Sequence, residues 1–271
     1  MIPELFKIGP VSISPFGVMM VLAFLSSWML LRWGVRRLDI GDEEDSSALL
    51  LAAGIGGILG AKIYYAALYG DWQLLFDRSG LVWYGALIGG ALTVVWTVRR
   101  RRMPLGRVVD VGGPTVAIGY AVGRVGCFLV GDDYGYPTDL PWGVKFPHGL
   151  PAPTTAGFME REYGAAIADG VSANELITVH PTQLYETLAA FAICALGVAL
   201  IRRGPKVGTV AIMSFGLLAL ERFGVEFLRA KDDRFFGQFT LAQLISALVV
   251  VLLSVLWAAR ERRANAVDPS P

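Results

Sequence analysis

Residues 239–259 read FTLAQLISALVVVLLSVLWAA, a stretch without a single Asp, Glu, Lys or Arg. A helix needs about 20 apolar residues to cross the hydrocarbon core of a bilayer, and this stretch has that length. Residues 11–31 and 80–98 are equally free of charged side chains. The chain therefore contains at least three segments that suit lipid better than water.

The composition of the whole chain agrees with a membrane setting. Of its 271 residues, 54% are hydrophobic and 17% are charged, and the mean hydropathy is +0.53. Soluble domains carry about 25% charged residues, so this deficit of charge indicates a polytopic membrane protein. The net charge of +1 gives no basic field for nucleic acid. Two cysteines and two histidines, far apart along the chain, predict no disulfide framework, no metal site and no cofactor.

Four further segments are long and apolar but contain isolated charged residues. They span residues 46–69, 111–131, 181–201 and 207–227. Together with the three uncharged stretches they predict an all-α polytopic membrane protein with seven transmembrane helices. We expect residues 1–271 to form a single transmembrane domain.

Arginine and lysine residues collect after alternate predicted spans. Basic clusters follow the first, third, fifth and seventh spans, at residues 32–37, 99–107, 202–206 and 260–263. Because cytoplasmic loops are enriched in Lys and Arg, this pattern predicts an outside N-terminus and a cytoplasmic C-terminus. Residues 132–180, between predicted helices four and five, then form a small extracytoplasmic head, and residues 260–271 form a cytoplasmic tail.

Small residues recur at four-residue spacing in two of the spans. Gly56 and Gly60 lie in the second predicted span, and Gly85 and Gly89 lie in the third. This spacing lets two helix backbones approach closely. We interpret these glycines as packing positions rather than as a binding site.

Charged side chains inside the predicted spans are the first candidates for function. Arg124 follows about a dozen uncharged residues, where a charge costs roughly 2.5–3.5 kcal/mol at mid-bilayer. At about 1.5 Å of rise per residue, Lys62, Arg124 and Arg222 lie about 20–24 Å from the cytoplasmic ends of their spans. Glu186 and Tyr84 lie near the outer ends of theirs. All five are therefore expected at one level, in the outer part of the membrane.

Two helix faces add polar groups to this level. They are the i, i+4, i+7 set Arg222, Glu226 and Arg229 and the i, i+3, i+6 set His180, Gln183 and Glu186. Two arginines that converge on one anion suit a phosphate, because the planar guanidinium matches its oxygen atoms. A structural reading stays open, in which Arg222 pairs with Glu226 while Asp132 or Glu186 satisfies Arg124. For Lys62, snorkelling to the outer interface is an equal alternative to ligand contact.

Five stretches of the chain carry a family resemblance. They are residues 60–64 (GAKIY), 83–90 (WYGALIGG), 123–135 (beginning GRVGCF), 180–186 (HPTQLYE) and 222–229 (RFGVEFLR). In this order they resemble the prolipoprotein diacylglyceryl transferase family. The resemblance implies transfer of the diacylglyceryl group from phosphatidylglycerol to the lipobox cysteine thiol of a preprolipoprotein signal peptide, the first step of bacterial lipoprotein maturation. It implies a site facing the outer leaflet of the bacterial cytoplasmic (inner) membrane.

The resemblance also implies roles for particular residues. The essential cations match Arg124 and Arg222, and the further catalytic candidates are Glu226, Tyr84 and Asp132. The expected substrate-binding residues are Arg124, Lys62, His180, Gln183, Tyr185, Glu186 and Arg229. No metal ligand is expected among them.

The chain departs from the family pattern at five positions. They are Phe16 for a usual Tyr, Tyr84 for His, Cys127 and Val130 for Asn, and Asp132 for Glu. A tyrosine, with an ordinary pKa of about 10, is a poor base at neutral pH. Glu226, Asp132 or the substrate phosphate are therefore alternative proton acceptors. A paralogue with a different acceptor, an anionic-solute transporter using the same arginines and an inactive lipid-binding protein remain alternative functions.

Overall fold

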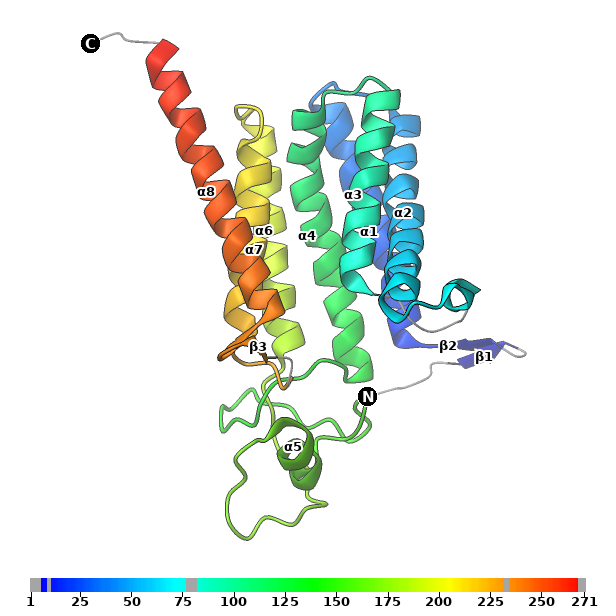
Figure 1. Cartoon of the computed structure of the whole chain (residues 1–271), viewed down its shortest axis with the longest axis vertical. Helices are drawn as coiled ribbons and strands as arrows, with labels where there is room; N and C mark the ends of the chain where they lie inside the picture. The colour runs from blue at the N-terminus through cyan, green and yellow to red at the C-terminus, as the bar shows by residue number, and fades with distance from the viewer. Residues whose placement is uncertain (1–5, 9–10, 77–81, 232–233, 268–271) are drawn as a thin grey trace. The chain divides into compact units, whose positions relative to one another are not determined.

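The computed structural model describes residues 6–8, 11–76, 82–231 and 234–267, and this part of the chain is predominantly helical (Figure 1). Its long helices are α1 (Pro15–Arg37), α2 (Glu43–Tyr69), α3 (Trp83–Arg100), α4 (Leu105–Val130), α6 (Thr182–Arg202), α7 (Thr209–Val225) and α8 (Leu241–Val267). The short helix α5 (Ala156–Tyr163) lies between α4 and α6, and a 3-10 helix η1 (Trp72–Phe76) follows α2.

Two small antiparallel pairs of strands complete the described elements. Strand β1 (Phe6–Ile8) pairs with β2 (Val11–Ile13) directly before α1. Strand β3 (Arg234–Phe236) pairs with β4 (Phe239–Thr240) directly before α8. Both pairs are too small to form a core, so the all-α class holds.

Five of the described helices are long and apolar enough to cross a membrane. They are α1, α2, α4, α6 and the part of α8 from Leu241 to Arg260. Helix α7 has only 17 residues, and α3 has 18 and ends in two arginines. The expected multi-pass membrane class is supported, whereas the count of seven spans and their orientation stay predictions.

Helix ends follow local chemistry that the apolar pattern alone does not show. Helix α2 begins three residues before the predicted span, because Asp42 and Asp45 form a reciprocal capping box. The Asp42 side chain accepts from the Asp45 amide at 2.9 Å, and Asp45 accepts from the Asp42 amide at 3.1 Å. The helix ends at Gly70, whose φ of 68° suits glycine. Helix α8 continues to Val267, so the described part of the expected tail is helical.

The chain divides into two compact units. Unit 2 comprises Ser26–Thr115 and Ala199–Ala211. Its core contains aliphatic residues from α1, α2, α3, α4, α6 and α7, among them the fully buried Val35 and Val210. Asp110, also fully buried, accepts from the Gly208 and Ala211 amides at 2.8 and 3.0 Å, and so caps the start of α7 from α4.

Helices α2 and α3 pack closely within unit 2 and lie side by side in Figure 1. A Cβ atom added to Gly60 would collide with the carbonyl oxygen of Gly85 and lie 2.8 Å from Cα of Gly89. A Cβ atom on Gly89 would collide with the carbonyl oxygen of Gly56. The packing role predicted for these four glycines is confirmed.

Unit 1 comprises Met1–Leu25, Val116–Val198 and Ile212–Pro271. The segment between α4 and α6 has its own apolar cluster, which includes the fully buried Phe146, Met159 and Val179. Its beginning is hydrogen-bonded to two distant parts of the chain. The Gly135 amide donates to the carbonyl before α6, at His180, and the Tyr136 amide donates to Leu228, after α7. These bonds hold three segments of unit 1 together: the chain after α4, the chain before α6 and the chain after α7.

Candidate functional site

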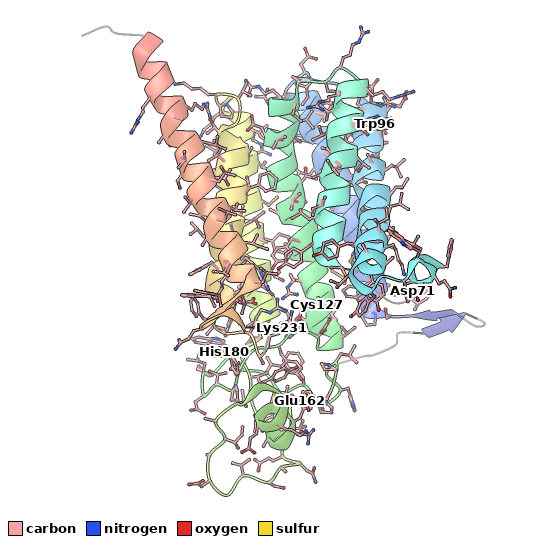
Figure 2. The ribbon with its side chains drawn as sticks, in the orientation of Figure 1. Asp71, Trp96, Cys127, Glu162, His180 and Lys231 are labelled. Carbon is pink, nitrogen blue, oxygen red and sulfur yellow. The ribbon has the colours of Figure 1, made fainter. Side chains whose placement is uncertain are left out.

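A cluster of arginines and carboxylates lies at one end of the helices of unit 1. Arg124 comes from α4, Glu186 from α6 and Arg222 from the last turn of α7. Glu226 and Arg229 follow in the turn after α7, which ends at Val225. Cys127, one turn beyond Arg124, and His180, just before α6, are labelled in Figure 2 near this level. The name arginine cluster is used below for six charged residues: Arg124, Asp133, Glu186, Arg222, Glu226 and Arg229.

Arg124 is buried, with 7% of its surface exposed, and it is fully engaged by carboxylates. Its Nε donates to Oε2 of Glu186, and its Nη2 forms an ion pair with the same oxygen. Its Nη1 donates to Oδ2 of Asp133 at 2.8 Å and contacts Sγ of Cys127 at 3.6 Å. The expected partner Glu186 is therefore present. The second carboxylate is Asp133, which the sequence reasoning did not select, rather than Asp132.

Glu186 is the centre of the cluster. It is completely buried, and its Oε1 accepts from the Tyr120 hydroxyl at 2.8 Å and from Arg222 Nη1 at 3.3 Å. Nη1 of Arg229 lies 3.9 Å from the same oxygen. One carboxylate thus holds three guanidinium groups, which offsets the cost of burying them. Its described contacts are with arginines and a tyrosine of the protein, and the substrate contact expected from the sequence stays a prediction.

Arg222 and Arg229 are joined to Glu226. Arg222 Nη2 lies 2.5 Å from Glu226 Oε2, as the i, i+4 spacing predicted, and Arg229 Nε lies 3.8 Å from the same atom. Arg229 also donates to Asp133 Oδ1 at 2.6 Å. Because α7 ends before Glu226, the turn rather than a continuous helix face brings Arg229 into the cluster. The Arg222 side chain is the most accessible of the three, at 26% exposure.

The charges of the cluster balance as the structure stands. Three guanidinium groups face the carboxylates of Glu186, Glu226 and Asp133. Glu186 and Glu226 are buried, whereas one third of the Asp133 side chain is exposed. Asp133 is therefore the carboxylate that an incoming anion can most easily displace from the arginines. The sequence did not indicate Asp133, because the family resemblance pointed to the neighbouring Asp132.

Asp132 and Asp133 have opposite electrostatic surroundings. Burial tends to raise the pKa of Asp133, but the positive charges of Arg229 and Arg124 outweigh it and hold that pKa below its usual range. Burial and the negative charge of Asp133 together raise the pKa of Asp132. Asp133 also has a φ of 61°, which is uncommon for a residue other than glycine. The two neighbours are thus suited to different tasks.

Gln183 supports the backbone of this aspartate pair. Its Nε2 donates to the Asp132 carbonyl at 2.6 Å, and the Thr182 hydroxyl donates to the Asp133 carbonyl at 2.8 Å. Gln183 is completely buried. The sequence placed Gln183 among the substrate-binding residues, and contact with substrate stays a prediction; in the structure its hydrogen bond supports the Asp132 backbone. Thr182, which the sequence reasoning did not single out, shares this role.

His180 and Tyr185 face a different part of the surface. They lie 3.3 Å apart through His180 Nδ1 and the Tyr185 hydroxyl, which also accepts from Trp142 Nε1 at 2.9 Å. Together with Trp142 and five apolar residues they line a hollow of about 640 Å³: Leu140, Pro181, Leu184, Leu188 and Leu228. Burial lowers the pKa of His180, so this imidazole is neutral at pH 7.

Two of the predicted site residues belong to the other compact unit. Lys62 lies on α2 and Tyr84 lies on α3, both within Ser26–Thr115. Both side chains are partly buried, and both have interactions within the protein. Their approach to the arginine cluster stays a prediction.

One group of side chains has donor atoms close enough for a metal ion. The ligand atoms of Cys127, Asp132 and Asp133 lie within 4.8 Å of one another. Arg124 Nη1, however, contacts both Cys127 and Asp133, and Arg229 occupies the other Asp133 oxygen. The positive charges of the Arg124 and Arg229 guanidinium groups would repel a metal cation at this point. The arrangement suits an anion better than a metal.

Comparison with known proteins identifies the chain's relatives. A family model described as prolipoprotein diacylglyceryl transferase matches residues 3–259. Curated proteins named phosphatidylglycerol–prolipoprotein diacylglyceryl transferase are similar over almost the full length. The one from Synechococcus elongatus is 30% identical, over 94% of this chain and 86% of the relative. Those from Stenotrophomonas maltophilia (31%; 98% and 94%) and Clostridium tetani (30%; 92% and 94%) match similarly.

Proposed function

The chain belongs to the prolipoprotein diacylglyceryl transferase family, and we propose that it transfers the diacylglyceryl group of phosphatidylglycerol to a lipobox cysteine. The acceptor is the signal peptide of a preprolipoprotein. The observation that carries the proposal is the convergence of Arg124, Arg222 and Arg229 on shared carboxylates at one end of the apolar helices of unit 1. The names of the curated relatives support the same substrates.

The proposed setting is the outer leaflet of the bacterial cytoplasmic membrane. Seven spans with an outside N-terminus put the arginine cluster and residues 132–180 on the outer side. The alternating basic clusters of the sequence support this orientation. Preprolipoprotein and lipid then reach the cluster from the same side of the membrane.

The proposed reaction exchanges a carbon–oxygen bond for a carbon–sulfur bond. The cysteine thiolate attacks the glyceryl carbon that bears the phosphate, and a thioether forms while the bond from that carbon to the phosphate oxygen breaks. The leaving group is glycerol phosphate, on which negative charge grows during the step. Guanidinium groups that are already held in place stabilise that charge without reorganisation.

We place the phosphate where the Asp133 carboxylate lies now. That carboxylate bridges Arg124 Nη1 and Arg229 Nη2 at 2.8 and 2.6 Å, the geometry that a phosphate oxygen pair would adopt. Arg222, the most accessible of the three, completes the set of donors. The buried Glu186 keeps the guanidinium groups in position while the phosphate displaces the Asp133 carboxylate.

The thiol must lose its proton before it attacks, because the thiolate is the nucleophile. We propose Asp132 as the proton acceptor. Its raised pKa makes it a stronger base than an ordinary aspartate, and the Gln183 amide fixes its backbone. Tyr84, Glu226 and the substrate phosphate remain the alternatives, and Glu226 is engaged by Arg222 and Arg229.

A direct assay tests the proposed function. The purified protein is incubated with phosphatidylglycerol and a lipobox peptide, and the thioether-linked diacylglyceryl adduct is sought by mass spectrometry. A peptide whose lipobox cysteine is replaced by serine is the matched control and should give no adduct. Absence of the adduct with the cysteine peptide, where the Stenotrophomonas maltophilia relative forms it, would overturn the proposal.

A further inference from the structure

An open hollow lies against one face of α1, near its arginine-rich end in unit 2. It has a volume of about 460 Å³ and is lined by Met29, Arg32, Trp33, Arg36 and Arg37. These residues follow the spacing i, i+3, i+4, i+7, i+8, which places them along one face of the helix. The hollow therefore combines three guanidinium groups with two largely apolar side chains.

The guanidinium groups at this hollow are only partly neutralised. Glu43 Oε2 lies 2.7 Å from Arg32 Nη2 and 3.0 Å from Arg36 Nη2. Arg37 donates to the backbone carbonyl of Arg202 at 3.1 Å, and the Arg202 guanidinium lies 5.8 Å from the centre of the Trp33 ring. Within the described residues, Glu43 is the carboxylate paired with these arginines. A net positive charge therefore remains.

The same helix face carries the marks of a membrane–water boundary. Met29 is 64% exposed, and 54% of the Arg36 side chain is exposed two turns further along. Trp28 donates to the Ser47 hydroxyl at 3.1 Å, and Arg32 lies over its ring at 5.3 Å. Tryptophan rings collect at the level of lipid headgroups. The hollow thus passes from an apolar side chain to exposed cations within two helical turns.

We propose that this hollow binds the phosphate headgroup of an anionic phospholipid. Guanidinium groups match phosphate oxygens, and basic pockets at the ends of transmembrane helices bind anionic headgroups. The Arg32 and Arg36 side chains are 34% and 54% exposed, so their guanidinium groups are accessible to a headgroup. The exposed Met29 favours a lipid over free phosphate, because it meets the lipid's acyl region.

This site is separate from the arginine cluster and does not depend on the proposed reaction. Its lining residues belong to Ser26–Thr115, whereas the arginine cluster belongs to unit 1. Bound lipid here would neutralise the excess charge at this end of α1. The expected ligand is a structural lipid rather than a substrate.

Native mass spectrometry of the full-length protein in detergent tests the proposal. Cardiolipin is the probe, since phosphatidylglycerol is the proposed substrate of the other site, and phosphatidylcholine is the neutral reference. The variant is Arg36→Gln with Arg37→Gln. The matched control, Arg99→Gln with Arg100→Gln, removes the same charge from exposed arginines at the end of α3.

We expect the preference for cardiolipin over phosphatidylcholine to fall about tenfold or more in the α1 variant and less than twofold in the control. An equal fall in both would show a diffuse basic surface and overturn the proposal, as would no fall in either. Displacement of cardiolipin by an equal concentration of inorganic phosphate would overturn the choice of a lipid. If thermal unfolding shows the double variant to be unfolded, each single variant, expected to lose about fivefold, decides the question.

Discussion

Single residues explain how unit 1 tolerates its buried charges. Arg124 was predictable as a functional candidate, because a lone arginine in a long apolar run stands out in the sequence. Its ion pair with Glu186 was one of the two pairings that the structural interpretation of the sequence allowed. The role of Asp133 was not predictable, because the choice between neighbouring aspartates depends on backbone direction. Asp133 has a φ of 61°, and its carboxylate bridges Arg124 and Arg229.

Arg222→Ala should abolish most activity while leaving the protein folded. Its side chain is partly exposed, and Glu186 keeps Arg124 and Tyr120 without it. Loss of one preorganised donor should lower kcat/KM by roughly 100- to 1,000-fold. The measurement is the rate of thioether formation, with thermal unfolding as the check on folding. Arg161→Ala, at an exposed arginine of α5, should retain full activity. A variant Arg222→Ala with near wild-type activity would assign this arginine a structural role.

Asp133→Asn should make phosphatidylglycerol bind more tightly. Without its charge, the side chain competes less well with phosphate for Arg124 and Arg229, so KM should fall by roughly three- to tenfold. The matched variant is Asp132→Asn, which should lower kcat and leave KM nearly unchanged, because it removes the proposed proton acceptor. Steady-state kinetics over a range of lipid concentrations distinguish the two. An increase of KM in Asp133→Asn would contradict the placement of the phosphate.

The pH dependence of activity should report the raised pKa of Asp132. A base must be deprotonated, so kcat/KM should rise with pH through a pKa above the ordinary value of about 3.9. Because the Asp133 charge contributes to the raised pKa, Asp133→Asn should move this rise to lower pH. The same raised pKa means that ionisation of Asp132 opposes folding, so its contribution to stability is lost as the pH rises through that value. An unchanged profile in Asp133→Asn would exclude Asp132 as the base.

At the scale of elements, apolar patterning predicted α2, α3, α6 and α7 to within three residues at each end. Helix α1 begins four and ends six residues later than predicted, α4 begins six residues earlier, and α8 ends eight residues later. Local chemistry set several of these ends. Helix α2 starts early because of the capping box at Asp42, and α4 starts early, at Leu105, and carries the buried Asp110 that caps α7. Helix α5 was not predicted. Its eight residues owe their place to the buried Met159, which packs in a cluster assembled from distant parts of the chain.

Gly60→Ala should destabilise the α2–α3 pair. The added methyl group would collide with the Gly85 carbonyl, and backbone atoms cannot move aside as a side chain can. We expect a loss of roughly 1–3 kcal/mol, partly offset by the better helix propensity of alanine. Gly57→Ala is the control, because its methyl group would meet Ala86 at an ordinary 3.6 Å. Thermal unfolding should separate the two variants; equal stability would show that α2 and α3 do not pack as tightly as described.

At the scale of the whole molecule, the predicted orientation in the membrane can be tested directly. A cysteine at the exposed position Asp169 should react with a membrane-impermeant maleimide in intact cells, whereas one at exposed Arg99 should react only after lysis. The native Cys127 and Cys194 are buried and give little background. The reverse labelling pattern would invert the predicted topology and place residues 132–180 in the cytoplasm.

The sequence by itself determined the membrane class, most of the helix positions, the close-packing role of the glycines in α2 and α3 and the family, because each depends on local composition or on short motifs. Only the tertiary structure decided how the charges are shared. Asp133, Glu186 and Arg229 meet through backbone hydrogen bonds that join segments about 50 and 90 residues apart. Ion pairs are set by side-chain direction at the ends of such segments, and spacing along the chain does not encode that direction.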